Sequence, residues 1–533
     1  MRLLRVAALA VSCAGFLLAA PAITGIYNAG SWLPPSLPNS GVAQGAIFTV
    51  TGTGLGPATL LEQSTYPLPT TQGLGGTTIQ VTVGGVTETC IMVYSWNLQV
   101  AAILPSATPV GAGTLMLSYQ GSSASFAIQV QTADFGTLTL NEGGTGPAVV
   151  TDDSYNPITM INPAYPGENL ILWGTGLGAV TGDETEPPAE INLNTGVQVL
   201  VENQSASIVY GGRSSSPGLD QINFVVPAGI TGCKVSLAVT VKGVTGNITT
   251  TSIAPAGQST CGDNYDALTA ANLQKAIASG SLSIGGVQLS RIAGGNDTMA
   301  AQFQSYPLNS LIRSYGGAAG PSIGNCLAYE TYGSTLEFTD PIQGTYLDAG
   351  SQLVITGPAA TRTVAATSTG DYPATLATAP SVFIEPGAYS AANGAGGANV
   401  GPFSWSLALP ASVVSTNIPT SINRAQDLTL TWTGGPGYTF LNLILFNGVP
   451  VTSTQNSYVY IVCTADASLG TFTIPSVFLN LLPPAGFGLP GKPGVEIQIA
   501  GTESNRFTVA GSPGLDAGFF SVLVSNGSVA TIQ

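Results

Sequence analysis

The chain has 533 residues, of which only 7% are charged, and it carries 27 Asp and Glu against 12 Lys and Arg. A net charge of −15 disfavours binding to nucleic acid or to anionic lipid, because both draw on Lys and Arg. The chain has no histidine, which excludes Ser-His-Asp and Cys-His catalysis and zinc sites with histidine ligands.

The first 22 residues have the three parts of a secretory signal peptide. Arg2 and Arg5 precede an apolar run, and the run ends at the A-x-A cleavage motif Ala20-Pro21-Ala22. The run is too short to span a bilayer, and no later segment predicts a membrane span. We therefore predict a signal peptide over 1–22 and a mature protein that is secreted or held at the cell surface.

Short runs rich in Val, Thr, Ile and Leu follow, separated by Gly and Pro, and this pattern is typical of an all-β protein. The segment 23–132 is predicted to be an Ig-like β-sandwich, and 133–260 a second one. The stretch "GAIFTVTGTGLG" at Gly45 aligns with "GENLILWGTGLG" at Gly167, and later blocks align in the same order. The repeat therefore predicts tandem copies of one domain.

The core G-T-G-L-G, present in both copies, raises the question of a phosphate-binding loop. Such a loop leads from a strand into a helix, but both copies are followed by segments that Pro and Gly interrupt. Both copies also depart from G-x-G-x-x-G and lack a P-loop lysine. We therefore predict positive-φ turns at six glycines: Gly52, Gly54, Gly56, Gly174, Gly176 and Gly178.

Two features of these modules could contact a ligand. Trp96 lies in the loop "YSWNLQ" and could stack on a sugar ring, whereas Trp405 and Trp432 lie in alternating apolar strands and are expected in the core. The segment "GDETEPPAE" contains acidic residues that could hold Ca²⁺, namely Asp183, Glu184 and Glu186. The alternating ligand spacing of a calcium loop is absent, so a stiff solvated loop is favoured and no metal is expected.

Several motifs occur in the order found in a repeat family. They are "NAGS", "AQGAIFTVTGTGLGP", "GGTTIQVTVGG", "QVAAILPSATPVGAGTL", "NPAYPGENLILWGTGLG", "DQINFVVPAGITGC" and "IAPAG". The segment from Ile23 to Cys261 resembles the repeat domain of secreted proteins expanded in Acidobacteria (Solibacter-type), whose modules are similar to IPT/TIG immunoglobulin-like domains. The resemblance implies a secreted Ig-like tandem. The family has no established activity, so the resemblance implies no catalytic residue.

The rest of the chain is predicted to be a mixed segment followed by further β-modules. In 261–340, the stretch "TAANLQKAIASG" predicts a short helix with Thr269 as N-cap and Gly280 as C-cap. Strand patterns then return. We divide them into a β-module over 341–412 and a sandwich-like C-terminal module over 413–533.

All cysteines except Cys13 lie beyond the signal peptide, and export favours disulfides between them. Cys233 opens a strand and Cys261 follows the next strand, so an antiparallel hairpin would bring them together. Cys326 and Cys463 form the second predicted pair, although nothing local joins them. Apolar neighbours of Cys90 predict a buried free thiol.

Two classes of function remain. The expected one is a secreted non-catalytic protein for adhesion, scaffolding or matrix contact, with an extracellular protein or glycan as its partner and with no cofactor. The alternative is a carbohydrate-binding or glycan-processing surface protein. That alternative would need exposed aromatic rings or two facing carboxylates.

Overall fold

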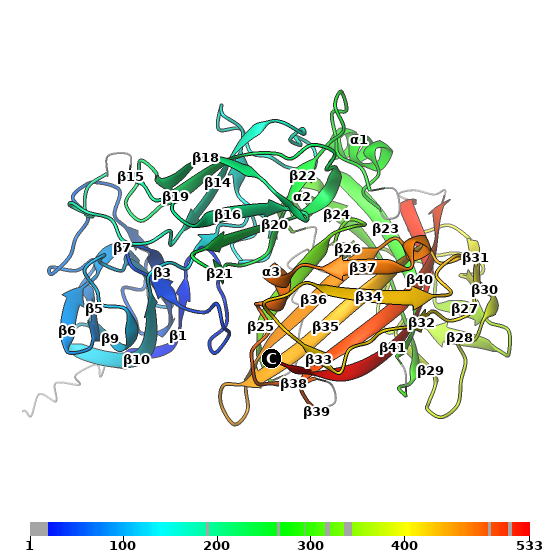
Figure 1. Cartoon of the computed structure of the whole chain (residues 1–533). Helices are drawn as coiled ribbons and strands as arrows, with labels where there is room; N and C mark the ends of the chain where they lie inside the picture. Colours follow the sequence, from blue (N-terminus) through cyan, green and yellow to red (C-terminus); the bar gives the residue numbers. More distant parts are fainter. Residues whose placement is uncertain are drawn as a thin grey trace, which may run out of the picture.

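The computed structural model describes residues 20–187, 191–263, 267–292, 294–314, 320–334, 344–488, 492–509 and 514–533. Residues 1–19 of the predicted signal peptide lie outside this part of the chain. About 51% of the residues are in strands and about 5% in helices, which confirms the all-β fold class. Figure 1 shows two sandwiches, in blue to green, beside a larger C-terminal body in green to red.

The first sandwich has two five-stranded sheets. One sheet has the order β1 (Ala22–Asn28), β3 (Ile47–Thr53), β8 (Gln99–Ile103), β7 (Ile91–Ser95) and β4 (Leu61–Glu62). The other has the order β2 (Val42–Ala43), β10 (Ser122–Gln131), β9 (Gly111–Tyr119), β5 (Thr77–Val83) and β6 (Val86–Thr89). Alternate residues of β5 are buried, including Ile79 and Val81, and they pack with Phe48 and Leu115 into one core.

The second sandwich repeats this arrangement. One sheet contains β11 (Gly136–Thr137), β14 (Asn169–Thr175), β19 (Asp220–Val225), β18 (Ser207–Arg213) and β15 (Ile191–Asn192), with β13 (Val150–Thr151) beside β14. The other contains β12 (Gly146–Pro147), β22 (Thr249–Ile253), β20 (Gly232–Val241), β16 (Val197–Val201) and β17 (Gln204–Ser205), with β21 (Val244–Thr245) beside β20. A register shift just before Tyr94 recurs just before Tyr210. The sequence repeat is thus a repeat of sandwich topology.

One large sheet organises the C-terminal body. Its main path is β25 (Cys326–Gly333), β36 (Asn456–Ala465), β35 (Phe440–Pro450), β40 (Val495–Val509), β41 (Leu515–Ile532), β23 (Ser281–Ile292), β24 (Asp297–Pro307) and β26 (Thr345–Tyr346). Shorter strands branch from it: β29 (Ala374–Ala377), β33 (Ser421–Ile422), β38 (Phe487–Gly488) and β39 (Lys492–Pro493). The sheet contains strands from all three segments that the sequence divided at 340 and 412. Strand β23 pairs in parallel with the distant β41, and β24 pairs with β26 and β29.

Two smaller sheets and three short helices complete the body. The sheets are β28 (Thr361–Ala365), β27 (Gln352–Thr356), β30 (Gly387–Ala392) and β31 (Ser404–Leu409), and β32 (Val414–Ser415), β34 (Leu428–Thr433) and β37 (Thr471–Ile474). The helices are α1 (Ala270–Ser279), α2 (Leu308–Ser314) and α3 (Ser476–Leu479), with a 3₁₀ turn η1 (Ala467–Leu469). Helix α1 has the expected caps, since Thr269 accepts the Asn272 N–H and Gly280 adopts φ 78°.

The tryptophans of this body are in its core, as the sequence predicted. The Trp405 ring stacks on Phe403 with centroids 4.0 Å apart and lies 5.4 Å from Phe507 in β40. The indole N–H of Trp432 donates to the Ala467 carbonyl at 2.9 Å. The Trp405 ring thus joins the sheet of β31 to the large sheet, and Trp432 belongs to the same buried core.

Residues 29–41, between β1 and β2, form a loop that we call the arm (Figure 1). Leu37 of the arm is buried in the C-terminal core. The Ser457 hydroxyl donates to the Pro35 carbonyl at 2.5 Å, and Asn39 Nδ2 donates to Glu330 Oε1 at 3.1 Å. The arm therefore holds the first sandwich against β25 and β36.

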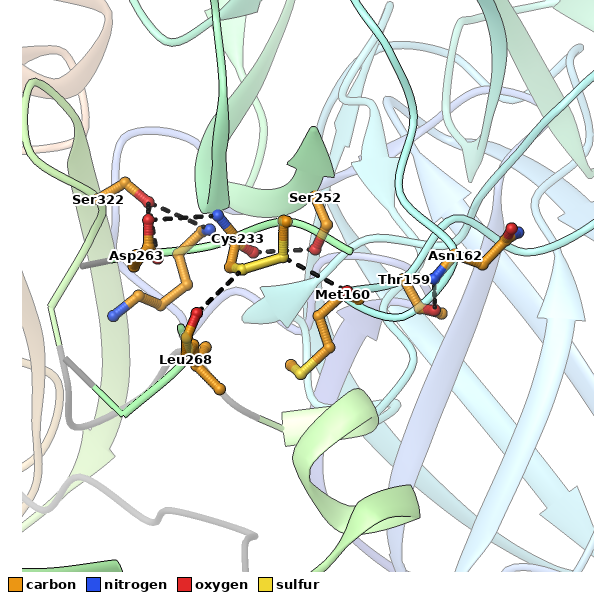
Figure 2. The surroundings of a disulfide bond; sticks show 10 residues. Thr159, Met160, Asn162, Cys233, Ser252, Asp263, Leu268 and Ser322 are labelled. Atoms are coloured by element: carbon orange, nitrogen blue, oxygen red, sulfur yellow. Dashed lines mark hydrogen bonds between the residues drawn. A yellow bond between two sulfur atoms is a disulfide. The ribbon is translucent and has the colours of Figure 1, made fainter. Parts of the chain in front are cut away.

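The described residues contain two disulfides, and these join the two predicted cysteine pairs. Cys233 and Cys261 are joined with a Cα–Cα distance of 5.2 Å, and Cys326 faces Cys463 across β25 and β36. Figure 2 shows the first bond between the second sandwich and the segment that leads to α1. The Ser322 hydroxyl donates to Asp263 there at 3.0 Å, so hydrogen bonds reinforce the covalent link.

Candidate functional site

A cleft of about 710 Å³ lies between the first sandwich, the arm and the C-terminal body. Residues Thr24–Asn28 of β1 and Phe126–Gln129 of β10 line one side. Tyr332 of β25 and Gln455, near the β35–β36 turn, line the other. The cleft therefore depends on contacts between modules that are distant in sequence.

Open strand edges form the sandwich side of the cleft. In the described part of the chain, strand β1 is the edge of its sheet and pairs only with β3. Strand β2 covers β10 only at Val130 and Gln131, so the neighbouring Phe126–Gln129 has a β-partner on one side only. Edge strands present unpaired N–H and C=O groups that can bind an extended ligand.

Two tyrosines flank the cleft. The Tyr27 ring lies over Gly25, where a Cβ would come within 2.4 Å of the Tyr27 hydroxyl, and it packs 5.5 Å from the Trp32 ring. Burial, and to a smaller extent Tyr332, raise the pKa of the Tyr27 hydroxyl, which therefore stays protonated. The Tyr332 hydroxyl donates to the side-chain oxygen of Gln455.

The chemistry of the cleft wall is neutral. Among the residues that the structure describes, those lining the cleft include no Asp, Glu, Lys or Arg. Its polar groups are amides and hydroxyls, among them Gln129, Gln455, Ser36, Ser40 and Thr452. Apolar surface with a few hydrogen-bonding groups suits a ligand that has both apolar faces and hydroxyls.

The repeated glycine turns are built for folding. Gly54, Gly176 and Gly178 have φ of 68°, 111° and 123°. The other three glycines do not have positive φ, so the prediction of positive-φ turns is wrong for them. Glycine is required there because neighbouring atoms leave no room for a Cβ. A Cβ would lie 2.0 Å from Ala22 O at Gly52, 2.4 Å from Ser95 Oγ at Gly56 and 2.3 Å from Phe135 Cζ at Gly174.

The second turn does hold a negative charge, but the charge belongs to the protein. Backbone N–H groups of Gly176 and Leu177 donate to Asp220 Oδ2 at 2.7 and 2.8 Å. Arg213 Nη1 lies 2.8 Å from Asp220 Oδ1, and Arg213 Nη2 donates to the Gly178 carbonyl. Burial raises the pKa of Asp220 to about 6 against the effect of Arg213. Asp220 thus occupies the place where a phosphate would bind.

The ligand candidates from the sequence lie elsewhere. Trp96 is half-buried, donates its indole N–H to Ala58 O at 3.1 Å and does not line the cleft. Asp183 accepts hydrogen bonds from Thr185, and Glu186 is exposed. Glu184 accepts both the N–H and the hydroxyl of Ser106, at 2.8 and 2.7 Å, and so links the two sandwiches.

In the part of the chain that the structure describes, no three His, Cys, Asp or Glu side chains form a metal-binding group. Within the same residues, no helix has the length and apolar character needed to cross a membrane. An aromatic pair that the sequence analysis missed lies on the second sandwich, where Tyr155 is 64% exposed and its ring is 6.2 Å from that of Trp173.

No protein-family model matches the chain, and no curated protein sequence matches it. The likeness to IPT/TIG and acidobacterial modules therefore stays a prediction. Among solved structures, the plexin A4 extracellular region is 16% identical with a TM-score of 0.15, and the match covers 42% of this chain and 17% of that chain. A Ca²⁺-stabilized adhesin of an Antarctic bacterium is 11% identical with a TM-score of 0.13, and the match covers 92% of this chain and 94% of that one.

A third similar structure is a Bacteroides ovatus protein of a mixed-linkage glucan utilization locus, SGBP-B, in complex with a mixed-linkage heptasaccharide. It is 9% identical with a TM-score of 0.14, and the match covers 85% of this chain and 97% of that one. Scores this low do not establish a shared arrangement of modules.

Proposed function

We propose that the protein is a secreted, non-catalytic binding protein that attaches to a neutral, hydroxyl-rich polymer, such as an uncharged polysaccharide, through the cleft between the first sandwich and the C-terminal body. The observation that carries this proposal is the neutral wall of the cleft in a chain with a net charge of −15. A charged ligand would need a charged partner in such a site.

The geometry of the wall supports a sugar polymer. Tyrosine rings offer an apolar face for the C–H side of a pyranose, while amides and hydroxyls can hydrogen-bond its O–H groups. Tyr332 and Gln129 lie on opposite sides of the cleft, so a chain passing between them would touch both modules. The two disulfides and the predicted signal peptide support an extracellular setting.

A panel of neutral and acidic polysaccharides, applied to the mature chain, tests the proposal. We expect binding to one or more neutral polymers, with an affinity that changes little between low and high salt because no ion pair forms. Tyr332→Ala and Gln129→Ala should each weaken it by about tenfold or more, the loss expected of an anchor in an interface.

Tyr155→Ala provides the matched control, because it removes an exposed ring from another face of the molecule. Binding that is restricted to acidic polymers, or that is lost in Tyr155→Ala and kept in Tyr332→Ala, would contradict the proposed site. Cleavage of the bound polymer would contradict the non-catalytic part of the proposal.

A further inference from the structure

Two buried carboxyl groups lie where the arm meets the second sandwich and the C-terminal body. Asp134 is 0% exposed, and Glu330 of β25 is 9% exposed. Asn39 Nδ2 of the arm donates to Glu330 Oε1 at 3.1 Å, and a Cβ built on Gly41 would lie 3.2 Å from Asp134 Oδ2. Since only Ser40 separates Asn39 from Gly41, both carboxyl groups lie against the same short stretch of the arm.

The oxygen atoms at this junction lack hydrogen-bond donors. Both side-chain oxygens of Asp134, Oε2 of Glu330 and Oδ1 of Asn39 are buried and accept no hydrogen bond from the described residues. The Asn39 side chain is held by the bond from its Nδ2 to Glu330, and Oδ1 of the same amide group is buried without a donor. Buried acceptors normally have partners.

Among the described residues, no Lys or Arg offsets the burial of these two acids. Burial, and then the charge of Glu330, raise the pKa of Asp134 well above its usual value. Burial raises the pKa of Glu330 to about 7, and the hydrogen bond from Asn39 opposes this. No Lys or Arg of the described chain contributes to either effect. Two buried carboxyl groups and an amide oxygen therefore meet here without a cation from the described part of the chain.

We infer that this junction binds one divalent, oxygen-preferring cation of the Ca²⁺ type, with Asp134, Glu330 and the side-chain oxygen of Asn39 as ligands. Carboxylate and amide oxygens are the ligands that Ca²⁺ takes, and one divalent ion neutralises two buried carboxylates. The ion would fasten the arm to both neighbouring modules. Ser40 and Gly41, next to Asn39, line the cleft, so the ion would also fix one wall of the cleft.

Ca²⁺ alone is the probe for this site. The mature full-length chain is treated with EDTA and dialysed, and bound Ca²⁺ is then counted by equilibrium dialysis at neutral pH. We expect one ion per chain at the junction and a rise of several degrees in the melting temperature, because a ligand of the folded state stabilises it. A wild-type chain that binds no Ca²⁺ would overturn the inference without any variant.

A double variant, Asp134→Asn with Glu330→Gln, locates the ion, since it keeps the side-chain shapes and removes both charges. We expect it to lose one bound ion and its thermal response to Ca²⁺, and to melt above the EDTA-treated wild type because the repulsion is gone. Asp183→Asn, which changes an exposed carboxylate of the acidic loop, should keep the full response.

Asn39→Ala is a milder change, and it should weaken Ca²⁺ binding about tenfold if the amide oxygen is a ligand. An unchanged ion count in the double variant would overturn the inference. The inference would also be overturned if acidification, but not Ca²⁺, stabilised the wild type. In that case protonation alone would neutralise the two acids. A failure of polysaccharide binding would leave the ion count unaffected, so the two proposals are tested separately.

Discussion

Gly176 is constrained by backbone conformation and by space at once. It has φ 111°, and a Cβ there would lie 2.1 Å from the Asp134 carbonyl oxygen. Gly182 shares the conformation, with φ 106°, but has nothing within 4 Å of its Cβ position. Gly182→Ala should therefore cost about 1 kcal/mol in unfolding free energy, and Gly176→Ala about 3 kcal/mol or more, because backbone must also move. Urea unfolding of both variants measures the difference, and equal costs would contradict it.

Cys90 is a buried free cysteine in the first sandwich. Burial, and then the charge of Glu88, raise the pKa of its thiol, so almost no reactive thiolate forms at neutral pH. We predict that iodoacetamide labels Cys90 in denaturant and leaves it unlabelled in the native chain. Peptide mapping after alkylation checks this. Full labelling under native conditions, or a disulfide-linked Cys90 peptide, would show the prediction to be wrong.

The raised pKa of Glu330 predicts that the stability of the cation-free protein depends on pH. Its folded pKa of about 7 lies above the ordinary value of 4.5, so the folded chain keeps a proton that the unfolded chain releases. The stabilisation is complete below pH 4.5 and is lost as pH rises towards 7. Melting curves with EDTA across this range should show Glu330→Gln falling less steeply than wild type, by at most about 1.4 kcal/mol per pH unit. Parallel curves would contradict this.

At the scale of elements, the two disulfides differ most in the loops they close. Cys233 and Cys261 are 28 residues apart, whereas Cys326 and Cys463 are 137 apart. Chain entropy then predicts a loss of about 3–4 kcal/mol for the Cys233→Ala/Cys261→Ala variant and about 5 kcal/mol for the second pair. Chemical unfolding of both variants tests the order. A larger loss for the first pair would mean that the local hydrogen bonds drawn around Cys233 in Figure 2 outweigh loop length.

Local signals in the sequence predicted several of these elements. Alternating apolar residues, the repeated blocks and the caps of α1 each act within a few residues, and the structure contains them. The hairpin argument for Cys233 and Cys261 was also local, because β20 and β22 pair directly. By contrast, the pairing of β23 with β41 joins strands far apart in the chain. The sequence of neither strand indicates which strand it pairs with. The division at 340 and 412 rests on local patterns alone, and it stays a prediction.

The cleft could not be predicted because it also depends on contacts between residues far apart in the sequence. Tyr27 and Tyr332 line the same cleft only because the arm docks on β25, and the Pro-rich arm has no periodicity that indicates a contact. Trp96 was the natural choice from sequence, since it lies in a loop, yet its indole N–H is bonded to Ala58. The sequence thus identifies aromatic residues near turns, while the arrangement of modules decides which of them face a ligand.

At the scale of the whole molecule, each of the two sandwiches and the C-terminal body contacts the other two. The sandwiches meet through Glu184 and Ser106, the second sandwich joins the C-terminal body beside Cys233, and the arm joins the first sandwich to β25. A site between modules exists only while these contacts hold.

Leu37 of the arm is buried in the C-terminal core. Its replacement by Ala should lower the free energy of unfolding by about 2–5 kcal/mol and weaken polymer binding. Unchanged polymer binding in Leu37→Ala would show that the docked arm is not needed for the binding site.

Hydrogen–deuterium exchange of the mature chain, with and without a bound neutral polysaccharide, tests the central claim most directly. If the polymer lies in the cleft, amide exchange should slow at the open edges of β1, over Thr24–Asn28, and of β10, over Phe126–Gln129. Peptides around Tyr155 and Trp173 should exchange as before. Protection confined to the Tyr155 face, or saturated binding with no protection at β1 and β10, would contradict the assignment of the cleft as the binding site.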